Sequence, residues 1–304
     1  MHTLAPVTTF LGAPVVHDPA TAEADVAILG VPYGVAYPEP GMTAGCAEAP
    51  KAVRDRSRRL ARFRGHWDFD VGRPFLPTDG VRIVDAGDVP GDPIDGATAS
   101  ALATEAVRAL LEAGAVPICI GGDDSVPIPI LRAWAGRGPI TVLHVDAHLD
   151  FRDEVQGVRE GYSSPMRRAS EMEHVARIVQ VGLRGVGSAR ASDVDDARRA
   201  GNLLVTAREL DERGVAWLLD QLPAEAAIFV SFDLDGLDPA VAPGVSAQAP
   251  GGIGWREADA LLAGIGPRLA GAAITELVPA LDPDGRTALA AARIACRLAD
   301  GLRA

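Results

Sequence analysis

The run His144–Asp150 carries side chains that bind metals at every second position, and it constrains this chain more than any other feature. Side chains on an extended strand alternate between two faces, so Asp146, His148 and Asp150 point the same way if the run stays extended. Left without partners, these groups would repel and desolvate one another, and a divalent cation would relieve that cost. The run therefore predicts part of a metal site at the end of a strand over 140–145.

The composition is that of a soluble globular enzyme. Of the 304 residues, 48% are hydrophobic and 23% are charged, so the chain has enough apolar side chains for one large core. We expect a single domain spanning 1–304. The net charge of −12, without a basic stripe, argues against nucleic acid as a partner and favours a small positive or neutral substrate.

The cysteines and the N-terminal residues indicate the compartment. Cys46, Cys119 and Cys296 show no C-x-x-C spacing, which suits a reducing environment and no disulfide framework. Residues 1–16 lack the basic and apolar pattern of a signal peptide, and no apolar run is long enough to span a membrane. We therefore expect a cytoplasmic protein without a membrane partner.

Short apolar runs alternate with helical patterns along the whole chain. Strands are predicted over 26–30, 81–84, 116–120, 140–145, 178–181, 203–206, 228–232 and 272–277. Helices are predicted over 49–60, 98–113, 130–135, 166–172, 193–200 and 255–262. This alternation predicts an α/β fold with a mainly parallel sheet of about eight strands, covered by helices on both faces. Function in such folds gathers at the carboxyl ends of the strands.

Two shorter patterns have structural interpretations. The helix over 49–60 carries several arginines, and we interpret them as an exposed basic face. Asp85–Asp88 follows the strand predicted over 81–84, and we interpret this acidic segment as a turn.

Two further segments with acidic side chains follow predicted strands. Asp233 and Asp235 lie two residues apart after the strand 228–232, and Gly121–Ser125 follows the strand 116–120. Its two glycines allow close approach of the backbone. An isolated D-x-D more often caps a turn, but together with His144–Asp150 these acids suit a hard or borderline ion such as Mn²⁺, and two ions rather than one.

These motifs resemble the ureohydrolase family of arginase and agmatinase. The resemblance rests on Gly121–Ser125, Asp146–Asp150 and Ser231–Pro239 followed by Pro243–Gly244, with support from Gly30–Tyr33, Gly41, Ala49–Arg54, Gly251–Ile253 and Ile274–Pro279. It implies a three-layer αβα sandwich and a dimanganese centre whose bridging hydroxide attacks a guanidinium carbon. Urea and an amine would be released. It also implies a homo-oligomer, a trimer or a hexamer.

The resemblance also assigns roles to individual residues. Asp146 and Asp233 would bridge the two metals, with Asp124 and Asp150 completing one site, and His148 and Asp235 the other. Glu276 would pair with the substrate guanidinium, which makes Asp146, His148 and Glu276 the candidate catalytic residues. Mn²⁺, two per chain, is the expected cofactor, with Ni²⁺ or Co²⁺ as substitutes.

Three positions depart from the family pattern. Asp124 stands where the family usually has His, which makes the site more negative and should lower the Lewis acidity of the metals. Tyr162 stands where agmatinases carry a His thought to shuttle protons, and we interpret it as an aromatic wall of the substrate pocket because its pKa is too high for that task. Gly34 replaces a common Asp.

Substrate identity stays open at this point. Arg152 or Arg159 would bind a substrate carboxylate and favour guanidino acids, although nearby acids such as Asp153 offer ordinary salt bridges. Tyr162, Glu276 and Arg152 are the candidate substrate-binding residues. The first hypothesis is metal-dependent hydrolysis of a small linear guanidino compound, either agmatine or a guanidino acid. A formimidoylglutamase-like hydrolase, suggested by 244–248, and a catalytically degenerate binding protein are the alternatives.

Overall fold

Eight parallel strands form one sheet in the computed structural model, which describes residues 1–35, 37, 44–91, 96–187 and 189–303. Gly41, which supported the family resemblance, lies outside this part. The strand order is β4-β1-β5-β10-β9-β6-β7-β8. Their bounds are β1 (Val26–Val31), β4 (Ile83–Asp88), β5 (Val116–Gly121), β6 (Ile140–Val145), β7 (Val175–Leu183), β8 (Leu203–Thr206), β9 (Ala227–Asp233) and β10 (Leu269–Thr275). The parallel sheet of eight strands is confirmed.

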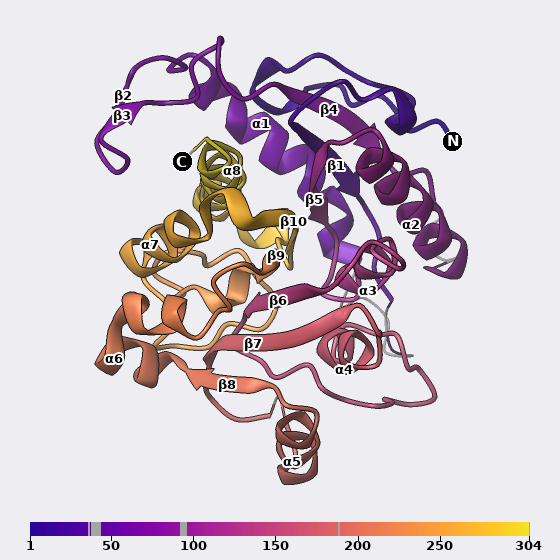
Figure 1. Cartoon of the computed structure of the whole chain (residues 1–304), viewed down its shortest axis with the longest axis vertical. Helices are drawn as coiled ribbons and strands as arrows, with labels where there is room; N and C mark the ends of the chain where they lie inside the picture. The colour runs from indigo at the N-terminus through magenta and orange to yellow at the C-terminus, as the bar shows by residue number, and fades with distance from the viewer. Residues whose placement is uncertain (36, 38–43, 92–95, 188, 304) are drawn as a thin grey trace.

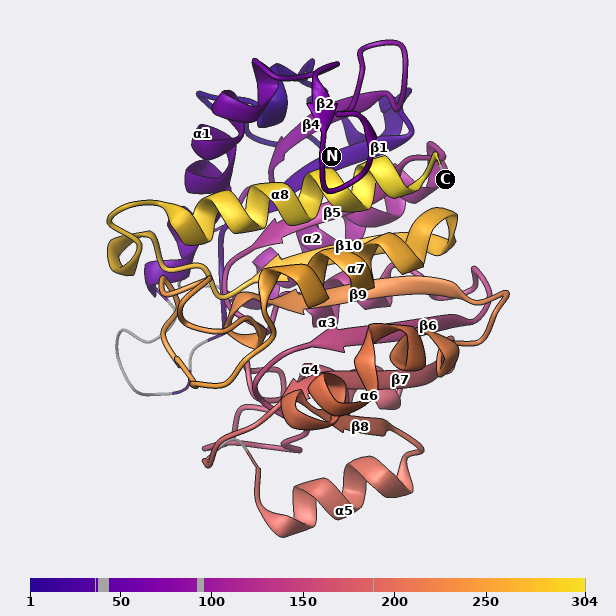
Figure 2. The ribbon, with the colours of Figure 1, turned by 90° about the vertical axis from the view of Figure 1, so that its left-hand side faces the viewer.

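Helices cover both faces of this sheet, as Figures 1 and 2 show. One face carries α1 (Ala49–Ala61), α6 (Ala207–Asp220), α7 (Trp255–Ile265) and α8 (Arg286–Gly301). The other carries α2 (Gly96–Glu112), α3 (Pro127–Arg132) and α4 (Pro165–Ser170), while α5 (Ala191–Arg199) lies beyond β8. The three-layer αβα arrangement is therefore confirmed.

The strands of the sheet consist largely of apolar residues because both of their faces are covered by helices. In β1, Val26 and Ile28 join the core under α1 and α8, whereas Ala27, Leu29 and Val31 join the core under α2. An antiparallel sheet with one wet face would instead alternate apolar and polar side chains.

Short elements complete the chain. A two-stranded antiparallel hairpin pairs β2 (Trp67–Asp68) with β3 (Arg73–Pro74). Six 3₁₀ helices in the described part of the chain are η1 (Phe10–Gly12), η2 (Pro19–Thr21), η3 (Ala44–Glu48), η4 (Leu234–Gly236), η5 (Gly266–Arg268) and η6 (Pro279–Leu281). None of the described helices has the length and apolar character needed to cross a bilayer.

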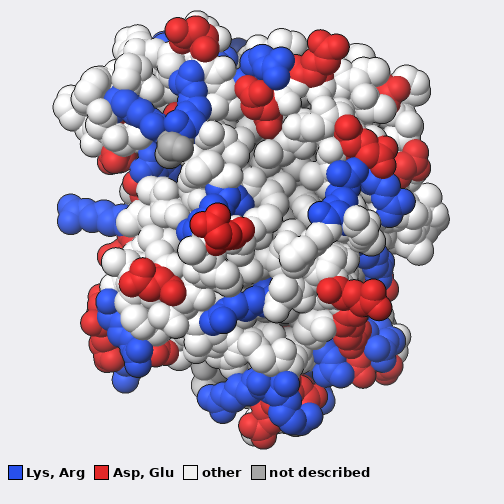
Figure 3. Space-filling model, viewed as in Figure 1, with Lys and Arg blue, Asp and Glu red and all other residues white. Residues whose placement is uncertain are grey.

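The surface in Figure 3 mixes charges of both signs. Acidic and basic side chains lie close together around a largely uncharged central region. This face carries no continuous basic stripe, in agreement with the net negative charge of the sequence.

The prediction of a turn at Asp85–Asp88 is wrong, because β4 continues through this segment. The carboxylates do not break the strand because Arg54 of α1 neutralises them inside the protein. Its guanidinium lies 2.9 Å from each Asp85 oxygen and also contacts Asp88. The prediction of an exposed basic face over 49–60 is thus wrong for Arg54, which is completely buried.

Helix positions and strand ends differ less from the predictions. The helix predicted over 130–135 is α3, which begins three residues earlier at Pro127, where proline suits a first helical turn. The strand predicted to end at 277 ends at Thr275, because Glu276 has a positive φ of 67° that leaves the strand geometry. The helices α6 and α8 were not predicted.

Replacing Arg54 with Met is expected to destabilise the protein by about 3–5 kcal/mol, because Asp85 would keep a buried charge without its partner. Urea unfolding followed by circular dichroism measures the change. The matched control is Arg58→Met, which removes an exposed arginine from the same helix and should change the stability by less than ~0.5 kcal/mol. Equal stability of the two variants would contradict the role of the buried ion pair.

Candidate metal centre

Four neighbouring strands bring the predicted ligands together. The order β5-β10-β9-β6 places the carboxyl ends of these parallel strands side by side. Each strand is followed by at least one acidic residue, and β6 is followed by the D-x-H-x-D run. The side chains that line the resulting cavity include Asp124 after β5, His148 and Asp150 after β6, Asp233 at the end of β9, Asp235 in η4, and Glu276 after β10.

The first group of ligand atoms comes from Asp124, His144, Asp146 and Asp150. One atom from each residue lies within 4.8 Å of the others, and all four residues are buried. The Nε2 atom of His144 is 2.9 Å from Asp146 Oδ2 and 3.6 Å from Asp124 Oδ2. This spacing is of the order that one metal ion requires between its ligands.

The second group comes from Asp146, His148 and Asp235, again with ligand atoms within 4.8 Å of one another. The Nδ1 atom of His148 lies 3.0 Å from Asp235 Oδ2 and 3.4 Å from Asp146 Oδ1. Asp146 therefore belongs to both groups and lies between them. A carboxylate in this position is suited to bridging two ions.

Several of these atoms have no hydrogen-bond partner among the described residues. Asp124 Oδ2, His144 Nε2 and Asp146 Oδ2 are buried and form no hydrogen bond, although the last two are close together. Buried polar atoms without partners are costly, and convergence of three such atoms on one point is what a bound cation would compensate. The donors, carboxylate oxygens and imidazole nitrogens, fit an ion such as Mn²⁺.

Burial and crowding change the pKa values of these groups. Burial raises the pKa of Asp235 to about 7 and holds those of Asp150 and Asp233 well above their usual range, with the Asp146 charge adding to the effect. Burial opposes protonation of His144, but the Asp146 and Asp124 carboxylates raise its pKa to about 9. The site thus holds protons where an ion would provide positive charge.

Asp233 is placed in the cavity but differs from the other predicted ligands. Its Oδ1 accepts a 2.7 Å hydrogen bond from the Asp235 backbone N–H, which closes the turn after β9. Neither of the two ligand groups found among the described residues includes it. Its carboxylate lines the cavity beside Asp124 and Asp235.

Glu276 is held in a defined position. Its backbone N–H donates to Gly122 O at 2.9 Å, and its Oε1 accepts from the Asp124 N–H at 2.8 Å. Burial raises the pKa of its carboxyl well above the usual range, and Asp123 and Asp235 contribute repulsion. The left-handed backbone at this residue turns the side chain toward the cavity lining, where the sequence predicted it.

The glycines near the site allow close packing of two loops. A Cβ atom at Gly122 would lie 1.8 Å from Tyr33 O, so the predicted close backbone approach is present. A Cβ at Gly34 would lie 2.2 Å from Asp123 Oδ2, so a larger side chain at this position would have to displace the Asp123 carboxylate. Asp123 Oδ1 accepts from the Ser125 N–H at 3.0 Å, which orients this loop.

The cavity has a volume of about 370 Å³, and Tyr162 lies in its wall. The ring of Tyr162 packs on Tyr37 with centroids 4.5 Å apart, and the Tyr37 hydroxyl accepts a hydrogen bond from the Ser163 N–H. Arg152 also lines the cavity, but its Nε is 3.3 Å from Asp193. Arg159 pairs with Asp153 instead of facing the cavity.

His144 is the ligand-type residue that sequence reasoning did not select. It precedes Asp146 by two positions on β6, so the same alternation that aligned Asp146, His148 and Asp150 would have placed it on their side. Its Nδ1 lies 3.2 Å from the Gln180 amide nitrogen, which leaves Nε2 directed at the carboxylates.

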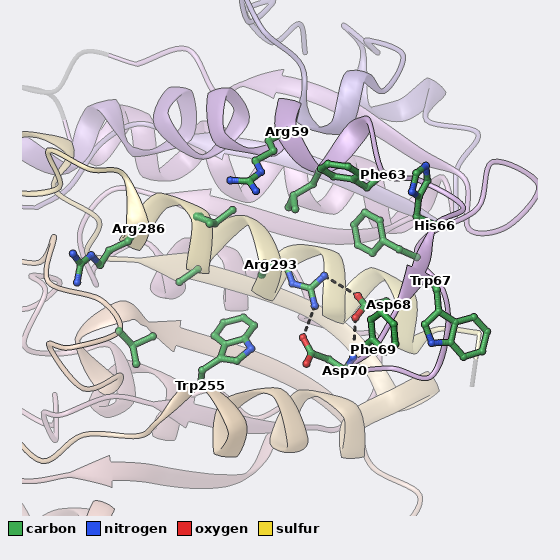
Figure 4. Close-up of a pocket in the computed structure, with 15 residues that line it drawn as sticks. Arg59, Phe63, His66, Trp67, Asp68, Phe69, Asp70, Trp255, Arg286 and Arg293 are labelled. Atoms are coloured by element: carbon green, nitrogen blue, oxygen red, sulfur yellow. Dashed lines mark hydrogen bonds and ion pairs between the residues drawn. The ribbon is translucent and has the colours of Figure 1, made fainter.

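A second cavity of about 610 Å³ lies elsewhere on the molecule and shares no lining residue with the first. Figure 4 shows it between α1, α8 and the β2–β3 hairpin, with Phe63, Trp67, Phe69 and Trp255 around it. Arg293 spans its floor and binds Asp68 and Asp70 of the hairpin. It contains neither group of ligand atoms.

Fold and site together define an α/β protein with a potential two-ion centre at the carboxyl end of its sheet. The sequence model of the arginase family matches residues 24–300. Proclavaminate amidinohydrolase of Streptomyces clavuligerus is 35% identical over 306 residues, covering 97% of this chain and 92% of that protein. Guanidinopropionase of Pseudomonas aeruginosa is 34% identical over 310 residues, covering 97% and 93%. The chain therefore belongs to the arginase family.

Solved structures agree with this assignment. The structure of the Streptomyces clavuligerus amidinohydrolase superposes with a TM-score of 0.84 at 33% identity, covering 98% of this chain and 97% of that one. A Trypanosoma cruzi formiminoglutamase, described with Mn²⁺, superposes with a TM-score of 0.81 at 27% identity, covering 92% and 94%. The fold of the family extends over nearly the whole chain.

Replacing His144 with Ala is expected to weaken metal retention about 10–100-fold, because the first ligand group loses a nitrogen or the support of Asp146. Metal content per chain after dialysis, measured by mass spectrometry, and Mn²⁺ titration calorimetry report the change. His66→Ala removes an exposed histidine and serves as the control. Unchanged metal content in folded His144→Ala protein would contradict the expectation.

Without metal, the protein is expected to lose stability as pH rises from about 4 to 9. The native state keeps a proton on Asp235 up to pH about 7 and on His144 up to about 9, whereas the unfolded chain releases them near 3.8 and 6.5. The stabilisation is complete below the unfolded values and is lost as pH passes the folded ones. Calorimetric Tm should fall by more than ~5 °C with chelator present, and much less with Mn²⁺. The same dependence of Tm on pH with chelator and with Mn²⁺ would contradict this expectation.

Proposed function

We propose that this chain hydrolyses a small linear guanidino compound to urea and an amine at a centre of two divalent cations. The observation that carries the proposal is Asp146, whose carboxylate belongs to two ligand groups at the base of one cavity. The names of the amidinohydrolase and guanidinopropionase relatives support the substrate class.

The residues present would hold two Mn²⁺ ions per chain, with Ni²⁺ or Co²⁺ as substitutes. Asp124, Asp146 and Asp150, with His144 beside them, would hold one ion, and Asp146, His148 and Asp235 would hold the other, while Asp233 lines the same cavity and would supply a further carboxylate. A pair of such ions lowers the pKa of a shared water so that hydroxide is available near neutral pH. Asp124 makes this centre more negative than one with a histidine at the same position.

The remaining residues would bind and orient the substrate. A guanidinium is stabilised by resonance and resists attack, so it must be held in place without losing its proton. Glu276 would perform this task, because its Oε1 accepts a hydrogen bond from the Asp124 N–H and its side chain lines the cavity. Tyr162 and Tyr37 would pack against the aliphatic part of the substrate.

A formimidoylglutamase-like reaction is the second candidate. It is favoured by the likeness to the Trypanosoma cruzi formiminoglutamase and by Ser246 and Ala247, which line the cavity within the segment 244–248. Formamide rather than urea would then be the product. A degenerate protein that only binds ligands is the other alternative: two metals per chain would favour catalysis, and none would favour degeneration.

The assembly and location that we propose are those expected from the sequence. We propose a single ureohydrolase domain spanning 1–304 that works in the cytoplasm as a trimer or hexamer. Trp67 and Phe69 support self-association, because their side chains are 57% and 91% exposed and such large apolar surfaces favour burial. Light scattering measures the number of chains.

Purified protein loaded with Mn²⁺ is expected to release urea from at least one of agmatine, 4-guanidinobutyrate, 3-guanidinopropionate and arginine. Asp146→Asn and Asp233→Asn keep the size of each side chain but remove a ligand charge, and each should lower kcat by about 100-fold or more. A colorimetric urea assay measures the activity of the wild type and of the variants. Asp195→Asn, on exposed α5, is the control. Full activity in the Asp146→Asn, Asp233→Asn double variant would refute the site.

A further inference from the structure

The cavity above the candidate metal centre has a buried floor and an exposed rim. The acidic residues that line it, Asp124, Asp150, Asp233, Asp235 and Glu276, are buried or half-buried at the carboxyl ends of the strands. The basic residues that line it are Arg152, in the loop after β6, and Arg190, which directly precedes α5. Apart from His148, which lies among the acids of the floor, the positive side chains of the lining therefore lie nearer the rim.

Arg152 already has a partner within the protein. Its Nε lies 3.3 Å from Asp193 Oδ2, and both side chains are largely buried, with 16% and 14% of their surface exposed. The same Asp193 oxygen accepts a 2.8 Å hydrogen bond from the Arg190 backbone N–H. This arrangement ties the start of α5 to the loop after β6 and holds Arg190 at the rim.

The guanidinium of Arg190 has no such partner. Its side chain is exposed and lines the cavity, and none of the described carboxylates forms an ion pair with it. Its five N–H donors in a planar fork match the two oxygens of a carboxylate. Val186 and Gly187 beside it on the rim carry no charge that would compete.

The depth of the charges fixes the orientation and the class of the substrate. A guanidinium head is attracted to the acidic floor, so the other end of a linear substrate faces the rim. An ammonium tail, as in agmatine, would there meet arginines and no exposed acid among the described lining residues. A carboxylate tail would meet a guanidinium that is free to bind it.

We propose that Arg190 binds the substrate carboxylate and makes this enzyme select guanidino acids over guanidino amines. The inference rests on the proposed function, and it moves carboxylate recognition from Arg152, which positions the loop, to Arg190. Because the contact is remote from the reacting carbon, its removal should raise KM more than it lowers kcat.

Steady-state urea release from 4-guanidinobutyrate, 5-guanidinopentanoate and agmatine tests the proposal with Mn²⁺-loaded protein. The wild type should favour the acids. Arg190→Gln should lower kcat/KM for the acids about 10–100-fold, mainly through KM, and leave agmatine unchanged. Arg190→Glu should reverse the preference, and Arg190→Lys should restore part of it. Arg199→Gln, which removes an exposed arginine of the same helix outside the cavity, is the matched control.

The outcomes separate this inference from the proposed function. An unchanged ratio of acid to agmatine turnover in Arg190→Gln, or a wild-type preference for agmatine, would overturn the inference while urea release still stands. If no compound releases urea, titration calorimetry of 4-guanidinobutyrate into wild type and Arg190→Gln decides the question. Weaker binding by the variant supports carboxylate recognition, and equal or absent binding overturns it.

Discussion

Mutual repulsion among buried carboxylates is the constraint on which the rest of this structure depends. The parallel order β5-β10-β9-β6 brings Asp124, Asp146 and Asp233 to one edge of the sheet, where burial penalises every negative charge. The His144 and His148 side chains neutralise only part of that charge. A rigid apolar scaffold is required to hold such a site together, and the covered strands supply it.

The same physical problem has a different solution at the other side of the sheet. Asp85 within β4 and Asp88 at its end are also buried or half-buried acids of a parallel strand, but Arg54 reaches them from α1 and forms ion pairs with both. Among the described residues, no arginine or lysine side chain reaches the cavity floor in this way. One acidic strand end is thus closed by the protein itself, whereas the other is left available to ions and substrate.

Chemistry and selectivity occupy different depths of the cavity. The floor carries carboxylates and an imidazole of the two ligand groups, which would determine the reaction in the proposed function. The rim is built by the loop after β6 and by the segment before α5, where Asp193 connects Arg152 with the Arg190 backbone. If Arg190 selects the substrate as proposed, substrate choice would change through rim residues without disturbing the ligands below.

The sequence by itself determined the positions of the eight strands and identified the D-x-H-x-D run as metal-binding. Both inferences depend on the periodicity of neighbouring residues. It also indicated that acids would gather at strand ends, since parallel strands share one carboxyl edge. Only the tertiary structure decided which charges find partners. Arg54 pairs with Asp85, which lies 31 residues further along the chain, and Arg152 in the loop after β6 pairs with Asp193 in α5. Pairing of this kind depends on distance in space, which local sequence patterns do not predict.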